Sequence, residues 1–333
     1  MITAVIPNYN HGHLINRSIA ALVNQKLQPS EIIIIDDAST DSSLMKIEKL
    51  TKKHPNIRLI KHEKNQGVIR SLNHGLKLTT TEYVYFGAAD DETDENLFLE
   101  LSRQFKEFPE SPFVCAEARL IAQNGKNIGT RPFAVLCTKP RFFSSKQTVE
   151  LMRDVDNLFL SAVSLINVKF LDKNIGFDET LGPYCDAQQL RRLAFHGGFV
   201  FVPQVLGTWH VLDGSYSQSI LTRSEQNKNF ISQVLASVKS DPIIPDWYHG
   251  LLRRRLYFSW FRALILTCPK SFLNLLQSDD LPILYPCRKL LILACALPTQ
   301  LNKIFALAII TVYFKPFKFR YIILSKIFRK VRK

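Results

Sequence analysis

Acidic residues stand side by side at two places where the sequence predicts the end of a strand. Asp36 and Asp37 follow a run of four isoleucines, and Asp90 and Asp91 follow the apolar segment 83–86. A carboxylate at a strand end can accept hydrogen bonds from a ribose hydroxyl or a base N–H. Carboxylate oxygens in an open site also suit Mg²⁺ or Mn²⁺ that bridges to phosphate oxygens. The two pairs therefore predict a site for a nucleotide and a divalent cation.

Each acidic cluster also has a structural interpretation. Ser39 or Asp41 could cap the helix that follows, and for these two residues that interpretation is preferred. Asp36 and Asp37 favour a functional interpretation, because adjacent acids at a buried strand end repel each other unless a positive or hydrogen-bonding group compensates. Taken alone, the sequence from Asp90 to Glu92 could equally be the solvated start of a helix.

The first part of the chain alternates short apolar runs with helical patterns. This alternation is typical of strand–helix–strand units around a mainly parallel sheet. Ligands of such sheets gather beyond the carboxyl ends of the strands, and polar clusters stand there at 7–10, 36–41 and 88–92. The predicted strands are 2–6, 31–35, 57–62 and 83–86, and the predicted helices are 14–24, 41–53 and 67–78.

A second region, 109–207, mixes predicted strands with helices, and the composition shifts toward helices from about residue 222. We expect a first domain over 1–222 and a helical, basic region over 223–333. The strands predicted in the second region are 113–118 and 199–205, and the helices are 146–152 and 186–195.

Ordered motifs over roughly residues 1–220 resemble glycosyltransferase family 2, the inverting GT-A enzymes that use nucleotide-sugar donors. The resemblance implies a GT-A α/β/α sandwich with a mainly parallel central sheet, followed here by the basic region. The residues that carry it are 5–10, 35–41, Asn65, Gly67, Ser71, Asn73, Gly75, Asp90, Asp91, 176–178, Gly182, Cys185, Asp186, Ala194, Phe195, Gly197, Pro203, Leu206 and 215–217.

The resemblance also implies roles for individual residues. Asp90 corresponds to the last Asp of the family's Asp-x-Asp motif and, with Asp91, would hold Mn²⁺ or Mg²⁺. Ala88 stands where the family has the first Asp, which removes one carboxylate. His210 would point toward the diphosphate, although a histidine beside Trp209 is as often a packed residue. The residues that would bind the donor are Pro7, Tyr9, Asp36, Asp37, Asn65, Gly67, Arg70, Asp90 and His210.

Asp186 aligns with the Asp of the family's Glu-Asp pair, and Cys185 replaces the Glu. In inverting transfer a carboxylate takes the proton of the acceptor hydroxyl, so Asp186 would be the catalytic base. A helix N-terminus would lower its pKa and burial would raise it, and the sequence leaves that balance open. As an alternative, Asp186 only caps the helix. Arg191 and Arg192 read as a solvated pair on the surface of that helix.

The positive charge is concentrated at the end of the chain. Lys and Arg number 43 against 29 Asp and Glu, a net charge of +14, but from Gly250 onward there are 16 basic residues and two acids. Long aliphatic runs between the cations suit acyl chains rather than a phosphate backbone, so we expect an anionic membrane surface as partner and no nucleic acid.

The segment 290–314 carries one charge, Lys303, and is interrupted by Pro298. Neither half reaches the roughly 18 to 20 apolar residues that span a bilayer, which favours an interfacial hairpin over a spanning helix. From 324 onward apolar and cationic residues fall on opposite helical faces, which is typical of a helix that lies on anionic lipid.

Together these observations predict an enzyme that moves a sugar from a nucleotide-diphosphate donor to an acceptor hydroxyl with inversion. The acceptor would be a glycan or a lipid-linked intermediate of surface polysaccharide or glycolipid synthesis. The alternative is a membrane-docked nucleotide-sugar-binding protein without chemistry, motivated by Ala88 and Cys185. The six cysteines show no Cys-x-x-Cys pair. They and the lack of a leader-like start predict a cytoplasmic protein, peripheral on the cytoplasmic face of a membrane.

Overall fold

The computed structural model describes residues 1–132, 134, 136–155, 158–212, 224–277, 281 and 283–315. The described residues divide into two compact units. The first comprises the described part of Met1–Leu212, and the second the described part of 224–315. The predicted amphipathic helix from 324 onward lies outside the described residues.

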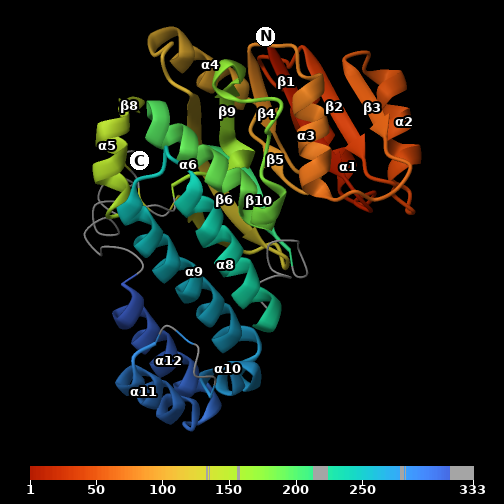
Figure 1. The fold of residues 1–333 in the computed structure, drawn as a ribbon. Helices are drawn as coiled ribbons and strands as arrows, with labels where there is room; N and C mark the ends of the chain where they lie inside the picture. The colour runs from red at the N-terminus through yellow and green to blue at the C-terminus, as the bar shows by residue number, and fades with distance from the viewer. Residues whose placement is uncertain are drawn as a thin grey trace. The chain divides into compact units, whose positions relative to one another are not determined.

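The first unit contains a ten-stranded sheet whose main path runs β3-β2-β1-β4-β9-β6-β10-β5, with β7 paired to β6 and β8 paired to β10 (Figure 1). The pairs β3–β2, β2–β1 and β1–β4 are parallel, as the alternation of strands and helices predicts. The elements in this half are β1 (Ile2–Asn8), α1 (Ile15–Val23), β2 (Glu31–Asp36), α2 (Ser43–Lys53), β3 (Ile57–Lys61), α3 (Val68–Leu78) and β4 (Tyr83–Phe86).

The other half of the sheet is mixed. Strand β9 runs antiparallel to both β4 and β6, whereas β6 and β10 are parallel to each other. Strand β5 pairs antiparallel with β10 and places Glu92 opposite Thr208. The elements are β5 (Glu92–Thr93), α4 (Leu97–Glu107), β6 (Phe113–Ala122), β7 (Asn127–Arg131), β8 (Arg141–Phe143), α5 (Ser145–Met152), η1 (Ser161–Val163), β9 (Ser164–Asn167), η2 (Val168–Phe170), η3 (Glu179–Tyr184), α6 (Cys185–Gly197) and β10 (Phe199–Val211).

Burial on both faces explains the apolar strands of the first half. Side chains alternate between the faces of a strand, and parallel strands covered by helices on both sides become apolar throughout. In β1, Ala4 and Ile6 belong to a core shared with α1 and α4, while Val5 contacts α3 on the other face. Helix α3 packs closely there because Gly75 has no side chain, and a Cβ at this position would lie 2.2 Å from a methyl carbon of Val5.

The second unit is entirely helical in the part that the structure describes. Its core is aromatic, with Trp260, Phe261 and Phe272 fully buried and Phe314 against Phe261 at a ring-centroid distance of 5.6 Å. No helix within the described ranges combines the length and the apolar character needed to cross a membrane. The helices are α8 (Ser224–Ser240), α9 (Asp246–Thr267), α10 (Pro269–Leu276), α11 (Tyr285–Cys295) and α12 (Thr299–Phe314).

The close approach of α3 to β1 gives a stability prediction. Gly75→Ala should lower the free energy of unfolding by about 1–3 kcal/mol, because the new methyl group overlaps Val5. Gly250→Ala in α9 is the matched control, since a Cβ there meets no atom within 4 Å. The control should gain up to roughly 1 kcal/mol from helix propensity. Urea unfolding measures both, and equal midpoints for the two variants would contradict the packing argument.

Candidate active site

Three loops meet at one edge of the sheet, where β1, β2 and β4 end. Parallel pairing brings the carboxyl ends of these strands together. The three polar clusters predicted from the sequence follow these ends, and backbone contacts connect two of them: the Asp37 N–H donates to the Asn8 carbonyl oxygen at 2.9 Å. The sequence thus predicts correctly which loops share this edge.

The Asp36 carboxylate connects the loop after β1 to the loop after β2. Its Oδ1 accepts from Asn8 Nδ2 at 2.8 Å and from the Ser39 hydroxyl at 2.7 Å, and its Oδ2 accepts from the Ser39 N–H at 3.0 Å. Asp36 is 1% exposed. Ser39 is therefore engaged with Asp36 and does not cap α2. Asp41 does assist that helix start, because its Oδ1 accepts from the Ser43 N–H at 2.9 Å.

The Asp37 carboxylate connects the ends of β2 and β3 with the start of α3. It accepts from His62 Nδ1 at 2.7 Å and from the N–H groups of Gln66 at 2.9 Å and Gly67 at 2.7 Å. His62 Nε2 lies 3.0 Å from Nδ1 of His74, whose pKa is lowered by burial and by the nearby His62. His62 carries no motif signal in the sequence, because it stands at the end of a strand 25 residues from its partner.

The chain's own donors thus supply the compensation that two adjacent buried acids require. Asp37, like Asp36, is almost inaccessible, with 2% of its surface exposed. Both carboxylates shape the loops around the strand ends in this structure. A direct contact of either with a nucleoside remains a prediction.

The other predicted donor-binding residues lie around this edge with different exposure. Tyr9 is 44% exposed immediately after β1, and Pro7 is half-buried within the strand. Asn65 is exposed, and Gly67 has φ +94° at the start of α3, a conformation that favours glycine. Arg70 is exposed and its Nε pairs with the Glu179 carboxylate at 2.9 Å.

Residues Ala88 to Asp91 form a turn that is held by α1. The Ser18 hydroxyl donates to the Ala88 carbonyl oxygen at 2.9 Å, and Arg17 Nη2 donates to the Asp90 carbonyl oxygen at 2.8 Å. A glycine after a strand could allow a ligand to approach closely, but a Cβ at Gly87 would lie 2.6 Å from side-chain atoms of both Ile6 and Tyr85. The lack of a side chain at Gly87 therefore lets the core side chains Ile6 and Tyr85 pack close to the backbone.

The two carboxylates of this turn differ in their surroundings. Asp91 is buried, its Oδ1 accepts from the His210 N–H at 3.1 Å, and burial together with the neighbouring Asp90 raises its pKa well above the usual range. Asp90 is half-buried, and within the described residues its carboxylate has no hydrogen bond or ion pair. A half-buried carboxylate without a partner, beside a second acid, fits a ligand of a hard divalent cation.

The described side chains contain no group of three or more His, Cys, Asp and Glu residues arranged to hold a metal ion. A cation at Asp90 would therefore need phosphate oxygens or water as further ligands. Ala88 in place of a third acid has the same consequence, because it leaves the turn with fewer carboxylate oxygens.

His210 belongs to the same neighbourhood. Its Nε2 lies 2.8 Å from Glu92 Oε1, and Arg17 Nε pairs with the same carboxylate oxygen at 3.0 Å. The β5–β10 pairing brings Glu92 and His210 together, and the backbone N–H of His210 binds Asp91. Its contact with a diphosphate stays a prediction. Residues 215–217, which carry part of the family resemblance, lie outside the described residues.

Asp186 lies in the first turn of α6. The helix starts at Cys185 and Tyr184 occupies the cap position, so the interpretation of Asp186 as an N-cap is wrong. Its Oδ1 accepts from the Ala187 N–H at 2.6 Å. Burial raises the pKa of the Asp186 carboxyl and outweighs this hydrogen bond and the charge of Arg191, which lower it. The balance that the sequence left open thus favours a carboxyl that binds its proton more tightly than usual.

Arg191 is not the solvated residue that the helix pattern predicted. It is 5% exposed, and its guanidinium carbon lies 4.8 Å from the centroid of the Tyr184 ring. Burial also raises the pKa of the neighbouring Cys185, which holds the thiol neutral. The helical pattern failed here because Tyr184 of η3 packs on Arg191, and a contact with a residue outside the helix is invisible in the periodicity of the helix.

Two lines of contact lead from Asp186 toward Asp91. Helix α6 packs against η1, where the Ser161 hydroxyl donates to the carbonyl oxygen of Phe86 at the end of β4. On the other side, the Arg131 guanidinium lowers the pKa of Asp186 and lies 5.4 Å from the Trp209 ring centroid. Trp209 precedes His210, whose N–H binds Asp91. Sequence analysis missed Arg131, which lies outside every motif.

The motif residues 176–178 lie against helix α3. Asn73 Nδ2 donates to the Phe177 carbonyl oxygen at 2.9 Å, and the Phe177 N–H donates to Asn73 Oδ1 at 2.7 Å. Gly176 has φ +63°, and a Cβ at this position would lie 2.3 Å from Asn73 Oδ1. The absence of a side chain at Gly176 therefore leaves room for Asn73, 103 positions earlier in the chain, to make both hydrogen bonds with the backbone of Phe177.

Comparisons with known proteins show which family and which solved structures this chain resembles. The family model for glycosyl transferase family 2 matches residues 3–161. A cholesterol galactosyltransferase of Borreliella burgdorferi is 32% identical over 134 residues, which are 40% of this chain and 37% of that protein. The alignments with this relative and with uncharacterized glycosyltransferases of Haemophilus influenzae and Escherichia coli cover 37%, 28% and 28% of those proteins' own lengths.

Two solved structures share the fold over nearly the whole chain. TarS 1–349 of S. aureus in complex with UDP-GlcNAc has a TM-score of 0.59 at 16% identity and covers 96% of this chain and 93% of its own. The mannosyltransferase PcManGT of Pyrobaculum calidifontis in complex with GDP-Man and Mn²⁺ has a TM-score of 0.57 at 18% identity, over 95% and 86%.

Residues 3–161 belong to glycosyl transferase family 2, and the chain has a GT-A-like α/β fold followed by a helical region. The resemblance carried by the ordered motifs is thereby confirmed.

The raised pKa of Asp91 predicts how stability depends on pH. A carboxyl with a raised folded-state pKa binds its proton more tightly when folded, so stability is greatest below its ordinary pKa of 3.8 and falls as pH rises through the folded-state value. Asp91→Asn removes this loss and can keep the hydrogen bond from His210. The melting temperatures of variant and wild type should converge in acid and separate at neutral pH, with the variant higher.

The melting curves are measured in EDTA, so that no divalent cation neutralises the acids. Glu95→Gln is the matched control, because the Glu95 side chain is 57% exposed in a surface pair with Lys26. Its curve should follow the wild type. Parallel curves for Asp91→Asn and wild type would contradict the assigned titration.

Proposed function

We propose that the protein is an inverting glycosyltransferase that moves a sugar from a nucleotide-diphosphate donor to an acceptor hydroxyl. One observation carries the proposal: the Asp90 carboxylate, which has no partner in the described part of the chain, lies beside the buried Asp91 where β4 ends, next to the loops after β1 and β2. This is the edge at which α/β sheets bind nucleotides.

The donor would lie along this edge. Tyr9 and Pro7 would contact the base. Asp36 and Asp37 fix the loops around the site, and a contact of either carboxylate with the nucleoside would use an oxygen lone pair that these hydrogen bonds leave free. Asn65, Gly67 and Arg70 would border the same site, and Arg70 would exchange its surface pair with Glu179 for the donor.

Asp90, with Asp91 beside it, would hold Mn²⁺ or Mg²⁺. When bound, the cation would neutralise the negative charge of the diphosphate leaving group. His210 would lie near the same phosphates, since its backbone N–H already binds Asp91 and its ring binds Glu92. The complex of PcManGT with GDP-Man and Mn²⁺ supports this assignment by analogy of fold.

Asp186 would act as the base. Its carboxylate would take the proton of the acceptor hydroxyl while that oxygen attacks the anomeric carbon, and the nucleotide diphosphate would leave from the opposite face. A raised pKa makes the carboxylate a stronger proton acceptor, which supports a chemical role over the alternative of a binding protein without chemistry.

The acceptor would be a glycan or a lipid-linked intermediate met at the cytoplasmic face of a membrane, as in the synthesis of surface polysaccharide or glycolipid. The net positive charge of the chain after residue 250 supports a location at an anionic surface. The name of the Borreliella burgdorferi relative, a cholesterol galactosyltransferase, is consistent with a lipid acceptor in this family.

Asp186→Asn tests the base. The variant should lose at least about a hundredfold in transfer rate, because the proton has no acceptor, while its donor affinity stays within about twofold. Radiolabelled sugar transfer to a membrane extract measures the rate, and equilibrium dialysis measures donor binding. Asp172→Asn, in an exposed loop before η3, is the control and should keep full activity. Full turnover by Asp186→Asn would refute its role.

Asp90→Ala tests the cation and the donor together. Thermal shift with a panel of UDP- and GDP-sugars, with and without Mn²⁺, should show a donor-dependent stabilisation that Mn²⁺ increases in the wild type. In Asp90→Ala the Mn²⁺-dependent part should disappear, whereas Glu95→Gln should retain it. An identical Mn²⁺ response in Asp90→Ala would remove this residue from the cation site, and no shift with any nucleotide sugar would contradict donor binding.

A further inference from the structure

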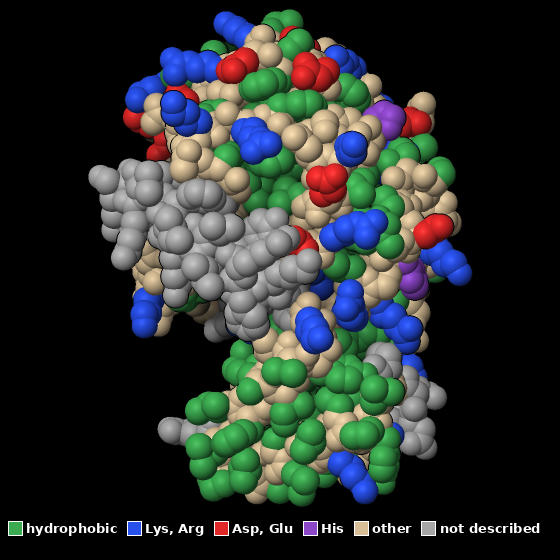
Figure 2. Space-filling view, turned by 90° about the vertical axis from the view of Figure 1, so that its left-hand side faces the viewer, with side chains coloured by type: hydrophobic (Ala, Val, Ile, Leu, Met, Phe, Trp, Pro, Cys, Tyr) green, Lys and Arg blue, Asp and Glu red, His purple; other side chains and the backbone are tan. Residues whose placement is uncertain are grey.

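The helices α11 and α12 expose an unusual amount of apolar surface. Within the described residues, ten large hydrophobic side chains between 284 and 312 are 37–71% exposed, whereas the much longer stretch 1–212 exposes seven. Figure 2 shows α10 to α12 at the bottom of the view, covered largely by green side chains with few blue ones and no red ones. We call the ten side chains the α11–α12 surface: Leu284, Tyr285, Leu290, Ile292, Leu293, Leu297, Leu301, Ile304, Phe305 and Val312.

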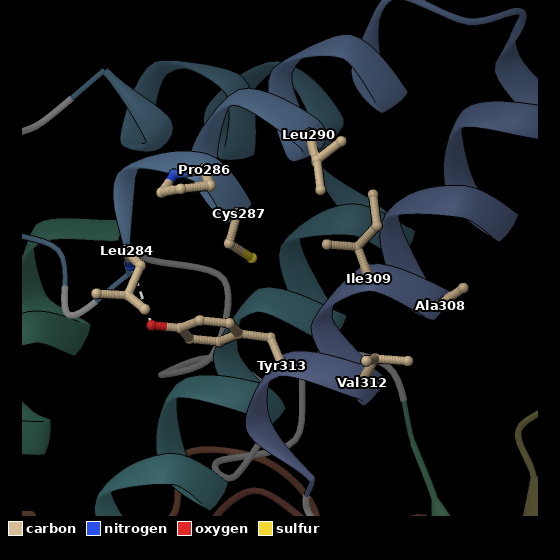
Figure 3. A pocket seen from close by; sticks show the side chains of 8 residues that line it. All are labelled: Leu284, Pro286, Cys287, Leu290, Ala308, Ile309, Val312 and Tyr313. Carbon is tan, nitrogen blue, oxygen red and sulfur yellow. Dashed lines mark hydrogen bonds between the residues drawn. The ribbon is translucent and has the colours of Figure 1, made fainter.

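A groove of about 460 Å³ runs between the two helices within this surface (Figure 3). Leu284, Cys287 and Leu290 come from the α11 side, and Ile309 and Val312 from α12. The volume lies within the range of about 300–1,000 Å³ that is typical of small-molecule sites.

The groove offers almost no polar group to a ligand. The one hydroxyl, of Tyr313, accepts the Leu284 N–H at 3.0 Å and is drawn as the dashed contact in Figure 3. Burial raises the pKa of the Cys287 thiol, which therefore stays neutral. A lining of this kind selects an apolar chain over a sugar, a nucleotide or a charged peptide.

The described segment that forms the groove carries charge of one sign. The segment 281–315 contains the cations Arg288, Lys289, Lys303 and Lys315 and no Asp or Glu, and the following 316–333 adds seven cations and no acid. Lys289 Nζ lies 4.7 Å from the Tyr285 ring centroid at the start of α11. An apolar surface that carries cations and lacks acids complements the headgroups and acyl chains of an anionic bilayer.

The dimensions of α12 favour a position within the interface. Its 16 residues extend over roughly 24 Å, less than the ~30 Å thickness of the hydrocarbon core. The exposed residues on both helices therefore meet acyl chains when the helices lie along the boundary between headgroups and hydrocarbon.

We propose that the α11–α12 surface inserts into the interfacial layer of an anionic bilayer and that the groove binds a phospholipid acyl chain. The inference rests on the proposed function only for the membrane location, and its tests below measure lipid binding without sugar transfer. A second copy of the chain fits less well, because a symmetric contact would bring the cations of both copies together with no acid to pair them.

Vesicle binding tests the surface. The full chain should sediment with vesicles of phosphatidylcholine and phosphatidylglycerol and much less with phosphatidylcholine alone. Leu293→Asp and Ile304→Asp, at side chains 65% and 62% exposed, should each weaken the partition by at least about tenfold. Ile175→Asp in the first unit is the matched control, because Ile175 is 72% exposed outside this surface, and it should bind as the wild type does.

Fluorescence tests the groove. In Leu290→Trp the new indole should be quenched by lipids brominated in the acyl chain, measured as the difference from the wild type, and Ile175→Trp should not be. Adding Ala308→Phe, which fills the groove with apolar atoms, should reduce the quenching of Leu290→Trp and leave vesicle binding unchanged. Quenching that Ala308→Phe does not alter would overturn the assignment of the groove.

Two further results would overturn the proposal as a whole. One is wild-type vesicle binding by Leu293→Asp and Ile304→Asp. The other is a concentration-dependent dimer, seen by sedimentation velocity without lipid and abolished by Leu293→Asp, since a second copy would then cover the surface. Donor binding by thermal shift is independent of both results, so failure of the enzymatic proposal and failure of this one can be told apart.

Discussion

Two adjacent carboxylates buried at the end of β2 are the constraint on which the site depends. Isolated buried charges are costly, and like charges on neighbouring residues increase the cost. Asp36 and Asp37 avoid it by accepting six hydrogen bonds from three loops, including those of Asn8 and His62. The same bonds fix where the chain leaves β1 and enters α3. The hydrogen bonds that offset the buried charges therefore also hold the loops in place.

The site also contains acids whose cost is not removed by the chain itself. Burial raises the pKa of Asp91 and of Asp186, and Asp90 has no partner within the described residues. Perturbed carboxyls of this kind gather at functional sites because binding or chemistry supplies the missing compensation. The contrast between satisfied acids at β2 and unsatisfied acids at β4 distinguishes the residues that build the edge from those available to a ligand.

Much of this arrangement follows from sequence. The strands β1, β2 and β4 are apolar because both faces are buried, so their ends and the polar clusters beyond them are predictable. Strand β5 has only two residues and no pattern of its own, and its pairing with β10, which brings His210 to Asp91, becomes visible only in three dimensions. Arg131 and Arg191 were missed or misjudged for the same reason, since their partners lie on other elements.

The Ser18 hydroxyl holds the turn after β4 by donating to the backbone carbonyl oxygen of residue 88. This hydrogen bond does not depend on which side chain residue 88 carries. The course of the backbone in this turn is consequently independent of the side chain at residue 88. An alanine and an aspartate can occupy the same turn, so a lineage can gain or lose one acidic group here without remodelling the surrounding scaffold. Variation at a single codon would then tune how strongly the site attracts cations while the nucleotide edge keeps its shape.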